Sequence, residues 1–148
     1  MKITTFDAFN RITPLQIERV TNFLYQHLDE YGDSKSAITK AINYAAKERT
    51  GLGGYVFTAE KDNTIVASVV INKTGMDEYI PENILVYVAT HKDYRGQGLG
   101  KTIIKHAIQN TNGDIALHVE KDNPAQHLYK KLGFTTPYLE MRLKKDNI

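Results

Sequence analysis

The stretch that decides the fold runs from residue 84 to residue 102 and reads ILVYVATHKDYRGQGLGKT. It begins with Ile84–Ala89, an almost wholly apolar run. A strand of this kind is covered on both faces, so we expect it at the centre of a sheet. The stretch ends with Gly96, Gly98 and Gly100, and residues 100, 103, 104, 107 and 108 then have the spacing of one helix face. The pattern predicts a strand, a glycine-rich turn and a helix.

The glycine-rich turn is of a kind that binds anions. Glycines allow successive main-chain N–H groups to point at one ligand, and the helix N-terminus adds about half a positive charge. Arg95, Lys101 and Lys92 supply full charges nearby. We therefore predict a phosphate or pyrophosphate site at this turn, against the alternative of a strand-to-helix turn that holds nothing.

Two common phosphate-binding motifs fit the turn incompletely. A P-loop has the pattern G-x-x-x-x-G-K-[ST], whose end matches residues 100–102 but whose first glycine would fall on Arg95. The dinucleotide fingerprint G-x-G-x-x-G would require a glycine in place of Lys101, although Glu120 stands at the distance of its acidic partner, about 20 residues. A nucleotide-binding P-loop protein therefore stays open as an alternative function, ranked third among those considered for this chain.

The whole chain, residues 1–148, reads as a single domain without an internal linker or repeat. Helical spacing follows Thr13-Pro14 and follows Asp33-Ser34, where either residue can cap a helix. We expect strands at 2–6, 55–60, 64–72, 84–89 and 115–119, helices at 14–31, 34–50, 100–108 and 123–133, and one or two closing strands within 134–143. The order β-αα-βββ-α-β-α-β(β) is that of a three-layer α/β (α+β) domain with few parallel strand pairs.

Two segments carry a family resemblance. Arg95-x-x-Gly98-x-Gly100, after an apolar strand, resembles the [QR]-x-x-G-x-[GA] signature of the GNAT superfamily of acetyl-CoA-dependent N-acetyltransferases. Residues 123–134, NPAQHLYKKLGF, look like that family's N-x-x-A-x-x-L-Y-x-x-x-G-F segment. The resemblance spans residues 84–134, about a third of the chain. It implies a mixed, mostly antiparallel sheet with a splayed central parallel strand pair and helices on both faces.

The resemblance also implies where acetyl-CoA binds. In such enzymes coenzyme A lies in a V-shaped gap between the central strand and the following parallel strand, here residues 84–90 and 115–119. The N–H near Val88 would bond the thioester carbonyl and stabilise the oxyanion, a donor worth ~3–4 kcal/mol of barrier. Ordinary sheet pairing is the alternative for Val88 and Thr90. The implied cofactor-binding residues are Val88, Ala89, Thr90, Arg95, Gly96, Gln97, Gly98, Leu99, Gly100, Lys101 and Asn123, the last of which is also a candidate helix cap.

Acyl transfer to an amine requires a proton donor for the thiolate and a base for the amine. Tyr129 occupies the family position whose phenol reaches the sulfur, with packing on the sheet as the alternative. Many members carry a carboxylate where this chain has Ile84. Glu82, two residues earlier, lies on the same strand face and would act as the base through one or two waters, with a solvated carboxylate as the alternative. His118 and Glu120 are further candidates for the base.

Composition and charge limit the partners. The 19 basic and 17 acidic residues give a net charge of +2, too small to indicate a nucleic-acid binder. No apolar run approaches the ~18 residues of a membrane span, and the N-terminus lacks a secretory signal. The chain has no cysteine, and its five histidines lack metal-ligand spacing. We expect no metal, a cytoplasmic location, and a monomer or a homodimer.

The expected activity is N-acetyl transfer to a small-molecule or peptide amine. A non-catalytic acyl-CoA-binding sensor on the same fold is the alternative. Acidic residues on the predicted acceptor side indicate a cationic acceptor, with solvated surface acids as the alternative reading. These residues are Asp29, Glu30, Asp33, Asp77, Glu78 and Glu82.

Overall fold

The computed structural model describes residues 1–147. The first unit of the chain, Met1–Leu117, contains a five-stranded sheet. The strands lie side by side in chain order: β1 (Lys2–Phe6), β2 (Gly54–Lys61), β3 (Thr64–Lys73), β4 (Asn83–Thr90) and β5 (Ile115–Leu117). Neighbouring strands are antiparallel from β1 to β4, and β5 is parallel to β4. The mixed, mostly antiparallel sheet confirms the predicted fold class.

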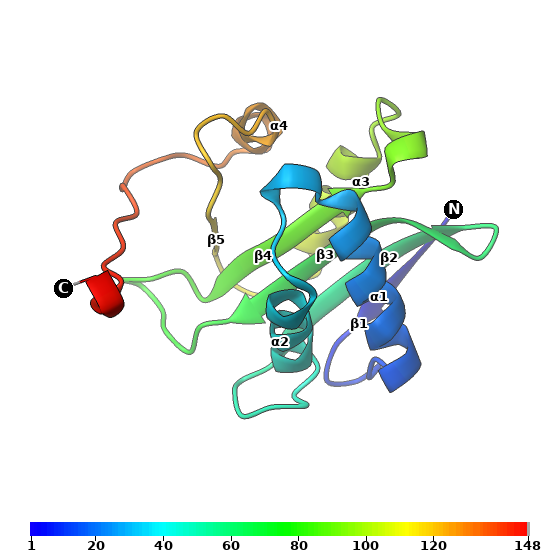
Figure 1. The fold of residues 1–148 in the computed structure, drawn as a ribbon, viewed down its shortest axis with the longest axis horizontal. Helices are drawn as coiled ribbons and strands as arrows, with labels where there is room; N and C mark the ends of the chain where they lie inside the picture. The colour runs from blue at the N-terminus through cyan, green and yellow to red at the C-terminus, as the bar shows by residue number, and fades with distance from the viewer. Residues whose placement is uncertain (148) are drawn as a thin grey trace. The chain divides into compact units, whose positions relative to one another are not determined.

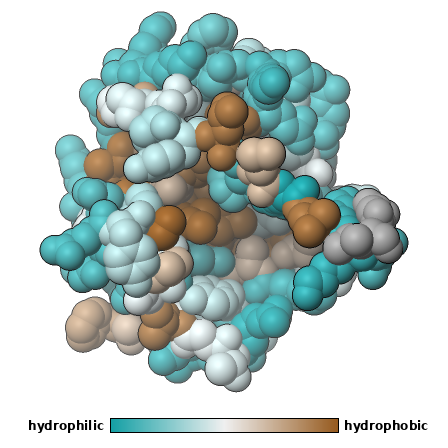
Figure 2. Space-filling model, turned by 90° about the vertical axis from the view of Figure 1, so that its left-hand side faces the viewer, coloured by the Kyte–Doolittle hydropathy of each residue, from teal (hydrophilic) through white to brown (hydrophobic). Residues whose placement is uncertain are grey.

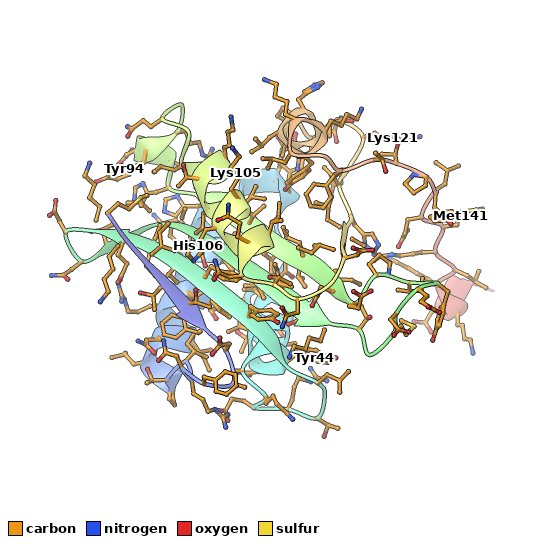
Figure 3. All side chains as sticks on the ribbon, turned by 180° about the vertical axis from the view of Figure 1, so that it is seen from behind. Tyr44, Tyr94, Lys105, His106, Lys121 and Met141 are labelled. Carbon is orange, nitrogen blue, oxygen red and sulfur yellow. The ribbon has the colours of Figure 1, made fainter. Side chains whose placement is uncertain are left out.

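Helices cover both faces of this sheet (Figure 1). They are α1 (Pro14–His27) and α2 (Lys35–Ala45) on one face and α3 (Leu99–Gln109) on the other. The α1/α2 face holds the main core, which includes Val20, Phe23, Leu24, Ile38, Ile42, Val56, Val70, Tyr87 and Ala89. On the opposite face His106 of α3, labelled in Figure 3, packs edge-on against Phe57 of β2 with ring centroids 5.7 Å apart.

Local sequence determines where these elements begin. The Thr13 hydroxyl accepts from the Gln16 N–H at 3.2 Å and the Gln16 side chain accepts from the Thr13 N–H at 2.8 Å, a capping box at the start of α1. Ser34 caps α2 through the Ala37 N–H. The hairpin between β2 and β3 turns at Asp62 and Asn63, both left-handed with φ of 51° and 64°, as a two-residue hairpin turn requires.

The apolar run at residues 84–89 was expected at the centre of the sheet, and that expectation is wrong. β3 is the middle strand, and β4 lies next to the short strand β5. Burial alternates along β4, with Leu85, Tyr87 and Ala89 buried and Val86 and Val88 partly exposed. Apolar side chains thus stand on a face that is only partly covered, which an apolar run alone does not reveal.

The remainder of the chain, from His118 onward, forms a second compact unit. It contains α4 (Ala125–Lys131) and a short 3-10 helix, η3 (Lys145–Asn147). The predicted closing strands within 134–143 are absent from this described segment. Leu139, Met141 and Leu143 do alternate as in a strand, but all three are at least 76% exposed, and no strand pairs with their backbone. Figure 2 shows hydrophobic residues, in brown, open to solvent on one face of the molecule.

Candidate active site

The parallel pairing of β4 with β5 covers only three residue pairs. The pairing runs from Asn83↔Ile115 to Leu85↔Leu117, whereas β4 continues to Thr90. The register with β3 shifts at the same place, since Leu85 faces Ile71 and Tyr87 faces Val70, which leaves one extra residue in β4. A bulge of this kind bends the strand. Residues 86–90 of β4 therefore lie beyond the three residue pairs with β5.

The direction of the main-chain groups in this part of β4 follows from one hydrogen bond. The His91 N–H donates to Val66 O of β3 at 2.8 Å. Because N–H groups alternate in direction along a strand, Ala89 directs its N–H toward β3, while Val88 and Thr90 direct theirs away from it. The N–H groups of Val88 and Thr90 thus point away from β3, whereas the N–H of Ala89 points toward it. The contacts of all three residues with coenzyme A stay predictions.

The glycine loop, defined here as residues 91–98, leads from β4 to α3. Gly96 and Gly98 have φ of 79° and 78°, in the left-handed region that favours glycine. A Cβ added to either glycine would meet nothing within 4 Å. Gly98 is the N-cap of α3, and its carbonyl accepts from the Thr102 N–H at 3.0 Å. The loop therefore faces open space at a helix N-terminus.

The N–H groups of the first turn of α3 are those of residues 99–101, which have no acceptor within a helix. Residues 96–98 directly precede them and supply further main-chain N–H groups, whose binding of a phosphate stays a prediction. Lys101 is exposed on the same turn. An anion would find both the donors and a positive charge there.

The two other cations at the loop, Lys92 and Arg95, are both paired with Asp29. Asp29 binds Lys92 Nζ at 3.2 Å and Arg95 Nη1 at 2.9 Å. Arg95 also donates to the main-chain carbonyls of His27, at 2.8 Å, and Thr90, at 3.2 Å. The hydrogen bonds from Arg95 and Lys92 lower the pKa of Asp29 below its ordinary value. Arg95 and Lys92 thus connect the loop to the end of α1. The Thr90 carbonyl already accepts from Arg95, so the N–H of Thr90 is the main-chain group that can bind a ligand.

His27 completes this attachment as a buried, neutral side chain. Its ring packs against the His91 ring at a tilt of 34° with centroids 4.2 Å apart, and its Nδ1 accepts from the Lys92 N–H at 3.2 Å. Burial, followed by the charges of His91, Arg95 and Lys92, lowers the pKa of His27 below its ordinary value of 6.5. Protonation at Nδ1 would remove the acceptor of the Lys92 N–H.

We expect this histidine to make the protein less stable in mild acid. Because the pKa of His27 is lower in the folded than in the unfolded state, the unfolded chain binds the extra proton first as pH falls below about 6.5. Above that pH the protonation of His27 therefore does not lower the free energy of unfolding, and below it the free energy of unfolding decreases. Urea unfolding between pH 7.5 and pH 5 should show a steeper loss for the natural chain than for His27→Gln. Equal slopes would contradict this assignment.

Glu82 lies at the other end of β4 from the glycine loop. Its Oε2 accepts from the Asp114 N–H at 2.9 Å, and a Cβ on Gly113 would come within 2.1 Å of that oxygen. At ~3.3 Å per strand residue, Glu82 is about 20 Å from Val88. The carboxylate thus joins the starts of β4 and β5, and its role as general base stays a prediction.

The second unit contains the predicted acid and the predicted helix cap. Tyr129 of α4 is 8% exposed and packs edge-on against Phe134, and burial raises the pKa of Tyr129 to about 12. Asn123 Oδ1 accepts from the Ala125 N–H at 2.9 Å and so supports the start of α4. Asn123 stands one residue closer to this alanine than the family pattern places its asparagine.

Two other candidates for the base also lie in the second unit. His118 and Glu120 are both exposed, and His118 Nδ1 lies 3.3 Å from Arg142 Nη2. Sequence reasoning did not find the attachment of the glycine loop to α1. Asp29 and Arg95 are 66 residues apart, so no local pattern links them.

Two other features, a metal site and a membrane-spanning helix, are not found among residues 1–147. Within residues 1–147, no group of three or more His, Asp or Glu side chains could hold a metal ion. No helix in this described range has both the length and the apolar character needed to cross a membrane.

Comparison with known proteins identifies the family. The family model of the acetyltransferase (GNAT) domain matches residues 53–136, more than half of the chain. A 5-NmdU N-acetyltransferase of Pseudomonas phage PaMx11 is 31% identical over 84 residues, which are 55% of this chain and 58% of the phage protein. The chain thus aligns with less than two thirds of that relative.

Solved structures share the fold at low sequence identity. The ribosomal-protein-S18-alanine N-acetyltransferase from Escherichia coli has a TM-score of 0.63 at 19% identity, over 90% of this chain and 78% of that one. A possible acetyltransferase from Clostridium difficile 630 has a TM-score of 0.67 at 18% identity, over 97% of both chains. The family match over more than half of the chain shows that this chain belongs to the GNAT acetyltransferase family.

Proposed function

We propose that the chain is an N-acetyltransferase that transfers an acetyl group from acetyl-CoA directly to a primary amine in a ternary complex. The observation that carries the proposal is that the pairing of β4 with β5 ends at Leu85, with the N–H groups of Val88 and Thr90 turned away from β3. Strand donors of this kind can bind an extended ligand as an added strand would. The phage relative, whose name is that of an N-acetyltransferase, supports nitrogen as the acceptor atom.

The glycine loop fits the diphosphate of coenzyme A. An added Cβ at Gly96 or Gly98 would meet only open space, so a ligand has room to approach the main chain there. The donors of residues 96–101 and the charge of Lys101 suit a diphosphate. Asn123 is a further proposed contact of coenzyme A. When bound, acetyl-CoA supplies the acetyl group as an activated thioester.

The proposed roles of the side chains concern protons and charge. The N–H of Val88 would stabilise negative charge on the carbonyl oxygen during attack. Tyr129 would donate its phenol proton to the departing sulfur, because its raised pKa keeps that proton bound at neutral pH. An amine with a pKa of ~10.4 is less than about one part in a thousand free base at neutral pH, so a base must collect its proton.

The acceptor that we propose is a cationic amine, small or on a peptide. Asp33 supports this assignment, since its exposed carboxylate accepts from the buried Tyr87 phenol at 2.5 Å. Burial and the bond to Asp33 raise the pKa of Tyr87, so the Tyr87 phenol stays the donor of this bond. Because Tyr87 precedes Val88 in β4, the Asp33 carboxylate is anchored to the strand that would bind the thioester.

Release of free thiol from acetyl-CoA tests the proposed activity. Polyamines, amino acids, aminoglycosides and peptide N-termini should include at least one acceptor that raises thiol release well above the rate without amine. Acetylation confined to neutral or anionic acceptors would contradict the cationic acceptor. Binding of acetyl-CoA without turnover on any amine would contradict the enzyme.

The second candidate is a non-catalytic acyl-CoA sensor, favoured by the bond between the Glu82 carboxylate and the Asp114 N–H. Glu82→Gln shows whether the Glu82 carboxylate is the general base or only joins the starts of β4 and β5. If Glu82 is the base, the variant loses the acidic limb of the pH profile of kcat/KM. If both limbs remain and only the free energy of unfolding decreases, Glu82 joins the two strands and has no part in proton transfer.

A further inference from the structure

Asp29 has an uncommon backbone conformation beside the glycine loop. It begins the short 3-10 helix η1 (Asp29–Tyr31) after α1, with φ of 56°. Residues other than glycine seldom adopt this left-handed region, although Asp and Asn do so more readily than most. Such conformations persist where the surrounding contacts hold them, and they concentrate at functional sites.

Both carboxylate oxygens of Asp29 are used on the glycine loop. Oδ1 binds Lys92 Nζ at 3.2 Å and Oδ2 binds Arg95 Nη1 at 2.9 Å. The other two nitrogens of the Arg95 guanidinium donate to His27 O and Thr90 O. One arginine thus connects the end of α1, the end of β4 and the loop.

We propose that Asp29 is a positioning residue, which holds the glycine loop in its binding conformation before coenzyme A arrives. The inference rests on the proposed function, in which that loop binds the diphosphate. A loop with two left-handed glycines has many conformations when free, and ordering it during binding would weaken affinity. Asp29, through Arg95 and Lys92, would order the loop in advance.

Because Asp29 is negatively charged, a change in affinity for coenzyme A after removal of its charge distinguishes two possible roles. A carboxylate next to an anion site repels the anion, so a purely electrostatic role predicts tighter binding once the charge is removed. A positioning role predicts weaker binding. Asp29→Asn removes the charge, keeps the side-chain size and suits the left-handed backbone.

We expect calorimetric titration with coenzyme A to give at least tenfold weaker binding for Asp29→Asn than for the natural chain. Glu30→Gln is the matched control, because Glu30 is the next residue, is exposed and has no bonded partner among the described residues. It loses the same charge and should bind within twofold of the natural chain. Equal or tighter binding by Asp29→Asn would overturn the proposal.

Hydrogen exchange of the protein without ligand gives a second readout, which does not depend on the proposed activity. Amides of residues 92–98 should exchange at least fivefold faster in Asp29→Asn and at the natural rate in Glu30→Gln. Arg95→Lys keeps the charge, but one ammonium cannot reach all three acceptors of Arg95, so it should also speed exchange in the loop. Unchanged exchange in both loop variants would overturn the proposal, even if their affinity falls. Failure of the natural chain to bind coenzyme A would instead contradict the proposed function.

Discussion

Gly98→Asp is expected to weaken binding of coenzyme A at least 100-fold. Gly98 has φ of 78° at the N-cap of α3, and a side chain there would enter the open space proposed for the diphosphate. Aspartate tolerates this backbone region and is a favoured N-cap residue, so α3 should still form. The new carboxylate would itself accept from the first N–H groups of the helix and would repel the diphosphate. Isothermal titration of the folded variant measures the loss.

Gly75→Asp is the matched control for this prediction. Gly75 has φ of 79° in the connection between β3 and β4, so both variants carry the same backbone strain and the same new charge. A Cβ on Gly75 meets the end of the Leu52 side chain at 2.7 Å, which can move aside. The control should lose some stability and keep the affinity for coenzyme A. Natural affinity in Gly98→Asp would remove the diphosphate from the glycine loop.

Tyr129→Phe is expected to lower kcat by ~10²- to 10⁴-fold, the range of general acid catalysis, and to leave the KM for acetyl-CoA nearly unchanged. The pKa of Tyr129, raised by burial to about 12, places its own titration far above neutral pH. Its loss should therefore lower the whole pH profile without moving either limb. Steady-state kinetics from pH 6 to pH 9 test both statements.

Tyr138→Phe removes a hydroxyl from the same unit of the chain and serves as the control. Tyr138 is 87% exposed, and the change should leave kcat within twofold of the natural value. Thermal unfolding shows whether Tyr129→Phe stays folded. An unchanged kcat in a folded Tyr129→Phe would mean that this tyrosine only packs against its neighbours, such as Phe134.

The parts of the fold that the sequence predicted well depend on local chemistry. Thr13 and Ser34 begin helices because their hydroxyls accept from the N–H groups that follow, and Asp62-Asn63 turns a hairpin because both residues tolerate positive φ. The strands expected within 134–143 failed because a strand needs a neighbour, which alternation of apolar residues does not supply. Leu139 and Met141 alternate correctly and remain exposed.

The same distinction applies to the site. The glycine loop was predictable, since the left-handed backbone of Gly96 and Gly98 is a property of those residues themselves. A positive charge of Arg95 near the loop is also predictable from the sequence. The pairing of Arg95 could not be predicted, because its partner Asp29 lies 66 residues away in the chain.

Amide NMR during a titration with acetyl-CoA shows whether the glycine loop and β4 bind the acetyl donor. We expect large shifts and slower exchange for the N–H groups of residues 96–101 and of Val88 and Thr90. The amide of Ala89, which points to β3, should keep its rate of exchange and so serves as an internal reference. Saturation with acetyl-CoA that leaves residues 96–101 unperturbed, or no binding at all, would contradict the proposed binding site.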